Sequence, residues 1–242
     1  MRNDDMPHKA IFITGAARSG TSLVAGTINI CGAFGGKMYP ANRYNQKGMF
    51  ENAEMRDNVV KDYLKKINVD PRGQYPLPDV NNLIMPDNFR GKVENIFISQ
   101  GYNDGHWFYK APKMCLFWPV WNQAFPDAKW VIVRRRTGDV INSCFKTGFM
   151  TAFQRKQIQK AVGAKNEREG WLWWIHQHEN RFIEMMKEGL NVKIIWPEKM
   201  LYGNYTEIKD TIEWLGLEWK EKEVMDFITP RLWSPYNKRK IK

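Results

Sequence analysis

The sequence has few cysteines and no long apolar stretch. Its three cysteines, Cys31, Cys115 and Cys144, are odd in number and far apart, which excludes the disulfide framework of small secreted proteins. We expect buried thiols in a reducing compartment. No segment approaches the roughly 20 apolar residues of a membrane helix, and the polar start MRNDDMPHKA lacks the apolar core of a signal peptide. The sequence therefore predicts a cytoplasmic protein without a membrane span.

Acidic residues are scarce relative to basic ones. The chain has 26 Asp and Glu against 37 Lys and Arg, a formal net charge of +11, so it should attract nucleic acid, an acidic surface or a multiply charged small ligand. Much of the excess lies in residues 134–136 and 237–242 rather than in a stripe interleaved with exposed aromatics. No motif supports nucleic-acid binding, and we do not expect it. No group of Cys, His, Asp or Glu has metal-site spacing, so we expect no metal.

Apolar runs alternate with helical patterns along the chain. The runs at 10–14, 107–110, 130–133 and 192–196 are typical of buried parallel strands. With helices between them, they predict an α/β fold of the three-layer P-loop type, in which helices flank a central parallel sheet. The length of 242 residues fits a single domain over 1–242.

Three segments have the apolar periodicity of helices. Residues 167–188 carry apolar side chains at three- and four-residue steps, and His178 lies on that stripe. We interpret it as a half-buried core histidine with its hydrogen bonds satisfied, not as a catalytic one. A helix before Gly216 ends at that glycine, and another is expected over 53–67. The proline-rich segment 70–86 predicts a surface loop or lid.

A glycine-rich loop follows the first predicted strand. Residues 15–22 are Gly-Ala-Ala-Arg-Ser-Gly-Thr-Ser, and an apolar helical pattern comes next. In a strand–loop–helix unit the backbone N–H groups of the loop and of the first helical turn surround an anion. The expected phosphate-binding residues are Gly15, Arg18, Ser19, Gly20, Thr21 and Ser22.

This loop differs from the one that binds nucleoside triphosphates. That version has Lys directly after its second glycine, where this chain has Thr21, and the cation comes earlier, as Arg18. The loop therefore suits a phosphate but not obviously a triphosphate. A P-loop kinase acting on a small metabolite is one alternative function, although it also requires a strand-end Asp for Mg²⁺ that is not evident. A non-enzymatic nucleic-acid-binding protein is the other, and it would leave the loop unused.

A second anion site is predicted after the strand 130–133. Arg134, Arg135 and Arg136 follow this strand, and Ser143 lies on the next helix. Ligands of open parallel sheets bind beyond the carboxyl ends of the strands, and arginine forms paired hydrogen bonds with phosphate. A nucleotide with both 5′- and 3′-phosphates would use both sites.

These motifs resemble those of the sulfotransferase family. Its loop ends in K/R-S-G-T-[ST], matched by residues 18–22, and its 3′-phosphate site is an Arg with a Ser eight positions on, matched by Arg135 and Ser143. The resemblance implies the donor 3′-phosphoadenosine 5′-phosphosulfate (PAPS), with 3′-phosphoadenosine 5′-phosphate (PAP) as product. It implies that Arg18 stabilises charge on the bridging oxygen and that the amides of residues 19–22 hold the 5′-phosphate. Whether Arg134 or Arg135 holds the 3′-phosphate stays open.

Three further segments are similar to the bacterial and carbohydrate-acting branch of that family. They are GMFEN at 48–52, KAPK at 110–113 and WLGL at 214–217. The resemblance implies sulfuryl transfer to a hydroxyl or amine of a small molecule or carbohydrate, and we expect the variable loops 37–46 and 70–86 to contact this acceptor.

Sulfuryl transfer should depend on cations, in-line positioning and a general base. Arg18, Lys110 and Lys113 are the candidate cations, and no metal is needed. Glu51 is the preferred base and His106 the second choice. The sequence does not identify the acceptor or the oligomeric state.

Overall fold

A four-stranded parallel sheet forms the centre of the molecule. The computed structural model describes residues 10–233, and its strands lie in the order β2-β1-β3-β4. Their bounds are β1 (Ala10–Thr14), β2 (Trp107–Lys110), β3 (Lys129–Val133) and β4 (Val192–Ile195). Every residue of β1 and β2 is buried, as expected for strands covered on both faces. The four predicted strands are confirmed, with shifts only at the start of β3 and the end of β4.

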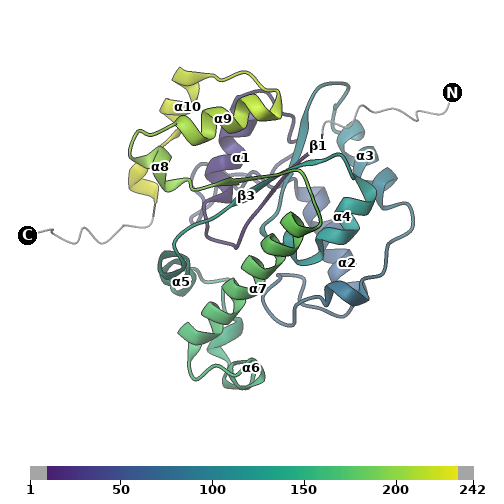
Figure 1. The fold of residues 1–242 in the computed structure, drawn as a ribbon, viewed down its shortest axis with the longest axis vertical. Helices are drawn as coiled ribbons and strands as arrows, with labels where there is room; N and C mark the ends of the chain where they lie inside the picture. The colour runs from purple at the N-terminus through teal and green to yellow at the C-terminus, as the bar shows by residue number, and fades with distance from the viewer. Residues whose placement is uncertain (1–9, 234–242) are drawn as a thin grey trace, which may run out of the picture.

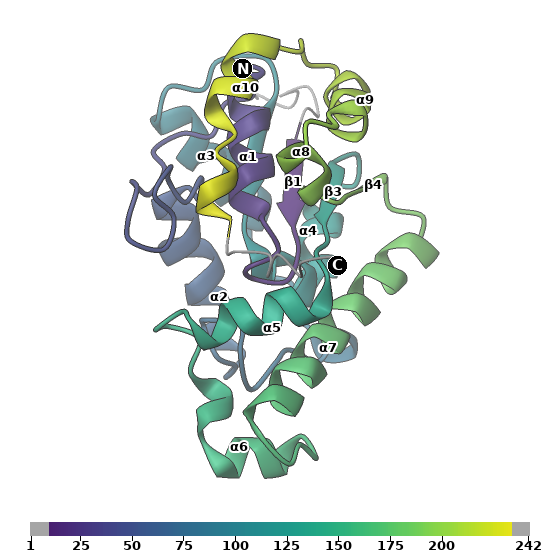
Figure 2. The same cartoon turned by 90° about the vertical axis from the view of Figure 1, so that its left-hand side faces the viewer.

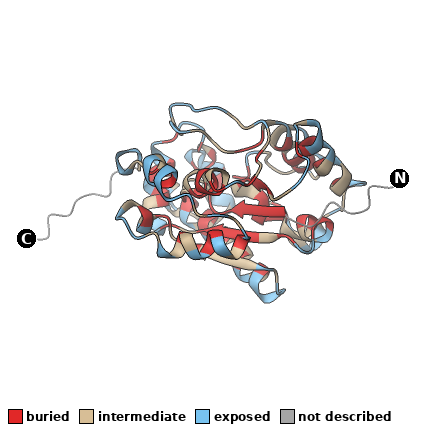
Figure 3. Cartoon of the chain, turned by 90° about the horizontal axis from the view of Figure 1, so that it is seen from above, coloured by how far each residue is buried: buried red, intermediate tan, exposed pale blue. Residues whose placement is uncertain are grey.

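Helices cover both faces of this sheet (Figure 1). Ile11 and Ile13 of β1 point into one core, which they share with α1 (Thr21–Ile30), α8 (Glu198–Leu201), α9 (Thr206–Leu215) and α10 (Glu221–Phe227). Ala10 and Phe12 point into the other core, against α2 (Lys61–Lys66), α3 (Phe89–Ser99), α4 (Trp118–Ala124) and part of α7 (Glu167–Lys187). Figure 3 shows the buried sheet between these layers. The predicted three-layer α/β fold is confirmed.

A third apolar cluster lies beyond the carboxyl end of β1 (Figure 2). It joins α5 (Thr137–Phe145), the 3₁₀ turn η4 (Ala152–Gln154), α6 (Lys156–Ala161) and the first half of α7. Ala16 of the glycine loop belongs to the same cluster. The loop is therefore anchored both to the sheet and to this helical extension.

The predicted helices are largely confirmed. α7 follows an Asn166 cap, whose side chain accepts a hydrogen bond from the backbone of Glu169, and α9 ends at Gly216 with φ +80°. The helix expected over 53–67 is confirmed over 53–66, but its central part, η1 (Met55–Val60), is π-helical, and only the last part, α2, is a regular α-helix. The other short turns are η2 (Val80–Asn82), η3 (Pro112–Phe117) and η5 (Pro230–Leu232).

The cysteine prediction is also confirmed, because Cys31, Cys115 and Cys144 are buried free thiols. Between residues 10 and 233, no helix is long and apolar enough to cross a membrane. The polar start of the chain up to residue 9 and the basic segment 237–242 lie outside the described residues.

The topology places a crevice beside β1. From β1 the chain crosses to β2 on one side of it, and then returns to β3 on the other side. The strand order therefore reverses between β1 and β3, which is where open parallel sheets bind ligands. The segments that follow these two strands are the glycine loop and the arginines 134–136.

Candidate functional site

The glycine loop links β1 to α1. At two of its positions, Gly15 and Gly20, the structure leaves no room for a larger residue. A Cβ added at Gly15 would lie 2.4 Å from the carbonyl oxygen of Val133, so a larger residue would push β1 and β3 apart. Gly20 has φ +98°, and a Cβ there would lie 2.5 Å from the ring of Trp233. It is the N-terminal cap residue of α1, whose first N–H groups have no partner within the helix. The hydroxyl of Ser19 is buried in the loop without a hydrogen-bond partner among the described residues.

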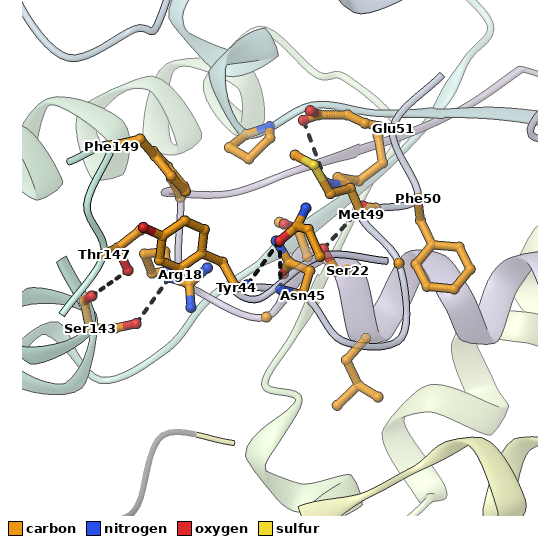
Figure 4. Close-up of a pocket in the computed structure, with 18 of the residues that line it drawn as sticks. Arg18, Ser22, Tyr44, Asn45, Met49, Phe50, Glu51, Ser143, Thr147 and Phe149 are labelled. Atoms are coloured by element: carbon orange, nitrogen blue, oxygen red, sulfur yellow. Dashed lines mark hydrogen bonds and ion pairs between the residues drawn. The ribbon is translucent and has the colours of Figure 1, made fainter. Parts of the chain in front are cut away.

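Arg18 connects this loop to the helix after β3. It has a positive φ of 75°, and its Nε donates to Ser143 Oγ at 3.0 Å. Figure 4 shows the Arg18 side chain pointing toward Ser143. Burial lowers the pKa of the guanidinium, but an arginine remains protonated in proteins. The residues from the two predicted anion sites thus contact each other directly.

Arg135 supports the same loop from β3. Its Nη1 donates to the backbone carbonyl of Arg18 at 3.1 Å, its Nε lies 3.7 Å from Glu198 Oε1, and its guanidinium lies 4.3 Å from the Trp233 ring centre. Burial, the largest cause, lowers the pKa of Arg135, while Asp139 and Glu198 raise it. Burial also raises the pKa of the Glu198 carboxyl.

Arg134 points elsewhere. It pairs with Glu179 of α7 through two contacts, Nε–Oε1 at 3.1 Å and Nη2–Oε2 at 2.5 Å, and its guanidinium packs on Trp196. Successive side chains of an extended segment face opposite ways, so only one of the two neighbouring arginines can face the loop. That residue is Arg135.

Glu51 and Lys110 form a buried ion pair. Lys110 Nζ lies 3.5 Å from Glu51 Oε1, and both side chains are at most 6% exposed. Arg56 Nη1 approaches the other carboxylate oxygen at 3.9 Å. Burial lowers the pKa of Lys110, whereas Glu51 raises it.

Hydrogen bonds hold both partners of this pair in position. The hydroxyl of Thr14, at the end of β1, donates to the carbonyl of Pro112 at 3.1 Å, which ties the segment after Lys110 to the end of the central strand. Ser22 Oγ of α1 donates to the carbonyl of Met49 at 3.1 Å, and the backbone N–H of Tyr39 donates to the carbonyl of Glu51 at 2.9 Å. The segment that carries Glu51 is therefore fixed to α1, the helix that follows the glycine loop.

These groups line one pocket of about 710 Å³. Of the residues singled out in the sequence, those on its wall are Arg18, Gly20, Thr21, Ser22, Glu51, Lys110, Lys113, Arg135 and Ser143. Gly15, Ser19 and Arg134 are not on the wall; the first two support the loop from inside. Parts of both predicted acceptor loops, residues 42–46 and 72–74, also line the pocket.

His106 is separated from this pocket, which corrects its choice as a second base. It precedes β2, whereas Lys110 ends that strand, so the two lie at opposite ends. Its backbone carbonyl accepts from Phe34 N at 2.8 Å, and its ring lies 3.4 Å from a Cβ built on Gly216. His106 cannot reach a group bound at the carboxyl ends of the strands.

His178 lies on the buried face of α7, as expected, but the expectation was wrong about its burial and its hydrogen bonds. The side chain is fully buried, not half-buried, at 1% exposed. Its Nδ1 contacts the carbonyl oxygen of Trp174 at 2.9 Å, while Nε2 has no hydrogen-bond partner among the described residues. Burial lowers the pKa of His178 to about 4, and the residue lies on the pocket wall.

The sequence did not indicate two further residues of the pocket wall, Phe149 and Trp233. Trp233 approaches Arg135 from a segment remote in sequence, and Phe149 meets Tyr44 at the rim with ring centres 5.5 Å apart. No local pattern marks such contacts, because each depends on how distant segments pack.

Comparison with known proteins identifies the fold. No family model matches the chain, and no curated protein matches it by sequence. Among solved structures it is similar to the sulfotransferase from Alicyclobacillus acidocaldarius, with 18% identity, a TM-score of 0.51, and coverage of 92% of this chain and 87% of that chain. The chain has the sulfotransferase fold. A sulfotransferase domain from the curacin biosynthetic pathway matches 90% of this chain and 77% of its own, with 13% identity and a TM-score of 0.51.

The sulfotransferase fold agrees with the resemblance of the motifs. Similarity at these identities establishes the architecture, and the side chains of the pocket must carry the argument about function.

Proposed function

We propose that this chain transfers a sulfuryl group from PAPS to a hydroxyl or amine of an acceptor. The observation that carries the proposal is the contact of Arg18 with Ser143, which joins a phosphate loop to a second anion site at the switch point of the sheet. A donor with phosphates at its 5′ and 3′ positions needs two such neighbouring sites. The sulfotransferase fold supports the same conclusion.

The pocket has features that fit this donor. Gly20 caps α1 without a side-chain hydrogen bond to the first turn, and Gly20, Thr21 and Ser22 line the pocket, which suits an anion held by backbone amides. Arg135 and Ser143 would hold the 3′-phosphate, and the amides of residues 19–22 would hold the 5′-phosphate. The Trp233 ring, packed on Arg135 and against Gly20, closes this half of the pocket.

Each polar group then has a defined task in the transfer. The acceptor oxygen or nitrogen forms a bond to sulfur as the bond between sulfur and the bridging oxygen of the 5′-phosphate breaks. Arg18 stabilises the negative charge that gathers on that bridging oxygen. Lys110 faces the sulfuryl oxygens, and Glu51 takes the proton from the acceptor.

The kinase alternative lacks the residues it needs. Position 21 is Thr instead of Lys, and none of the four described strands ends in an Asp or is directly followed by one. The nucleic-acid alternative would leave the buried pair of Glu51 and Lys110 and the loop without a role.

Thermal unfolding with nucleotides tests the proposal. We expect PAP, at about 100 times its Kd, to raise the melting temperature by roughly 5–10 °C, and we expect ATP with Mg²⁺ at the same concentration to raise it much less. The loop lacks the lysine that reaches the β- and γ-phosphates. A larger shift with ATP and Mg²⁺ than with PAP would contradict the proposal.

The two neighbouring arginines give a matched comparison of the 3′-phosphate site. Arg135→Ala should weaken PAP binding by roughly 10- to 100-fold, because charge-assisted hydrogen bonds contribute about 1.5–3 kcal/mol each. Arg134→Ala removes the same charge from the adjacent position, yet it should change PAP affinity less than about threefold. Isothermal titration of both variants with PAP measures this difference, and equal losses would mean that the assignment of the 3′-phosphate to Arg135 is wrong.

A further inference from the structure

The half of the pocket away from the nucleotide site is formed by three segments that meet at its rim. Residues 42–50, 72–74 and 146–150 all line it. Gln74 Nε2 donates to the carbonyl of Phe149 at 2.7 Å, and Tyr44 packs edge-on against Phe149, as Figure 4 shows. These contacts hold the rim together without a bound ligand.

Each of these segments contributes a cation. Arg43, Arg72 and Lys146 are exposed on the rim, and Lys113 lies half-buried below them, with its Cβ 2.9 Å from a Cβ built on Gly73. In the part of the chain that the structure describes, none of these four side chains forms an ion pair. Arg43 instead makes a cation–π contact, with its guanidinium 4.7 Å from the ring centre of Tyr44.

The opposing charge needed by these cations is absent from the pocket wall. Glu51 is the only carboxylate among the described residues that line the pocket, and Lys110 and Arg56 already contact it. Burial lowers the pKa of Lys113, and its cationic neighbours Lys61, Arg56 and Lys110 lower it further, while Glu51 raises it. A desolvated ammonium group without a counterion favours an anion supplied from outside.

The nucleotide does not account for this charge. Its two phosphate sites use Arg18 and Arg135, which contact each other through the loop. Arg43 and Arg72 belong to other segments, and Lys146 follows α5, one turn beyond Ser143. None of these three residues has an assigned contact with the donor.

His178 is a second feature of the pocket wall that bears on the chemistry of the ligand. A backbone carbonyl can only accept a hydrogen bond, so Nδ1 must donate to Trp174, and the bare Nε2 of the neutral ring is an acceptor without a partner. A buried acceptor of this kind is stabilised by a ligand O–H or N–H. The pocket thus has one hydrogen-bond acceptor without a partner, on His178, and several cations at its rim.

We infer that the acceptor is an anionic polyol, a molecule that carries a carboxylate or sulfate beside its hydroxyl groups. This inference rests on the proposed function and names the class of its acceptor. The anion pairs with Arg72, Lys146 and Lys113, a hydroxyl donates to His178, and the rings of Tyr44 and Phe149, which pack edge to face, provide apolar contacts for a sugar ring.

Matched pairs of ligands test this inference on the PAP-saturated protein. 4-Nitrophenyl β-glucuronide is compared with the corresponding glucoside, and glucose 6-sulfate is compared with glucose, by isothermal titration at low salt. We expect the charged member of at least one pair to bind at least tenfold more tightly, and the preferred pair identifies the anion. Salt at 0.5 M should reduce the preference, because it screens exposed cations.

A charge-matched pair of variants locates the effect. Arg72→Ala with Lys146→Ala should reduce the preference to less than threefold and leave PAP affinity unchanged. The control, Lys187→Ala with Lys222→Ala, removes the same net charge from exposed positions away from the pocket and should keep the full preference.

Three outcomes would overturn the inference: no preference within either pair, an equal loss in the control, or a loss of PAP affinity in the rim variant. Failure of the proposed function is distinguishable, since it appears as an absence of PAP binding by the unmodified protein. In that case the same titrations without nucleotide still show whether the rim selects anions.

Discussion

Replacing Arg18 by Ala should reduce the turnover of sulfuryl transfer by about 100- to 1,000-fold. This is the typical cost of removing one preorganised hydrogen-bond donor from a site where charge develops. Arg18 is the one cation within the glycine loop, and Ser143 and the loop backbone hold it in place. Because charge on the bridging oxygen develops only as the bond to sulfur breaks, the loss should fall mainly on kcat. Stopped assays with labelled PAPS measure kcat and KM separately.

Arg18→Lys is the matched control for this experiment. It keeps the charge but loses the planar guanidinium that donates to Ser143, so we expect intermediate turnover, with PAP affinity within a few-fold of the unmodified protein. Normal turnover in Arg18→Ala would exclude a catalytic role for this residue. A large loss of PAP affinity with unchanged kcat would instead assign Arg18 to nucleotide binding alone.

The fold was predictable from the sequence because its strands are local features. Each strand is a short apolar run, and burial on both faces requires no alternation with polar residues. The helix expected over 53–67 is present, but its central part, residues 55–60, is π-helical. Its apolar residues, such as Met55 and Val59, still reach the core, so the periodicity detected the buried face but not the hydrogen-bond pattern.

The residues of the proposed nucleotide site could be named from the sequence because they fall within two short segments, 15–22 and 135–143. The glycines, Arg18 and Ser19 lie within one loop, and the spacing of Arg135 and Ser143 follows from one strand end and one helix. The sequence left Arg134 and Arg135 as equivalent candidates. The distinction depends on Glu179, a residue of α7 that is remote in sequence and binds Arg134.

The acceptor half could not be predicted in the same way. Arg72 and Lys146 come from separate loops, and their proximity to one pocket depends on the packing of Gln74 and Tyr44 against the turn at Phe149. His178 occupies an apolar stripe on α7, and the periodicity of a helix cannot tell a core position from one that borders a cavity. The buried partner of Lys110 likewise lies on a distant segment, at Glu51.

Replacing Glu51 by Gln should have two separate effects, which follow from its position beside Lys110. Without a carboxylate to accept the proton, turnover should fall by about 100- to 10,000-fold, the range typical of general acid–base groups. The protein should also lose about 3–5 kcal/mol of stability, because Lys110 is left as a buried charge without its partner. Urea unfolding measures the stability, and transfer assays below the unfolding midpoint measure the turnover.

A double variant separates the two effects. Glu51→Gln with Lys110→Met removes both charges, and Arg56 keeps its contact with Asp57 at 3.3 Å. Stability should then recover most of the loss, whereas turnover should stay at the level of Glu51→Gln or below. If the double variant recovered turnover together with stability, Glu51 would be a structural partner of Lys110, and the proton acceptor would have to be another group. The next to test is His178, which lines the pocket and whose Nε2 has no hydrogen-bond partner among the described residues.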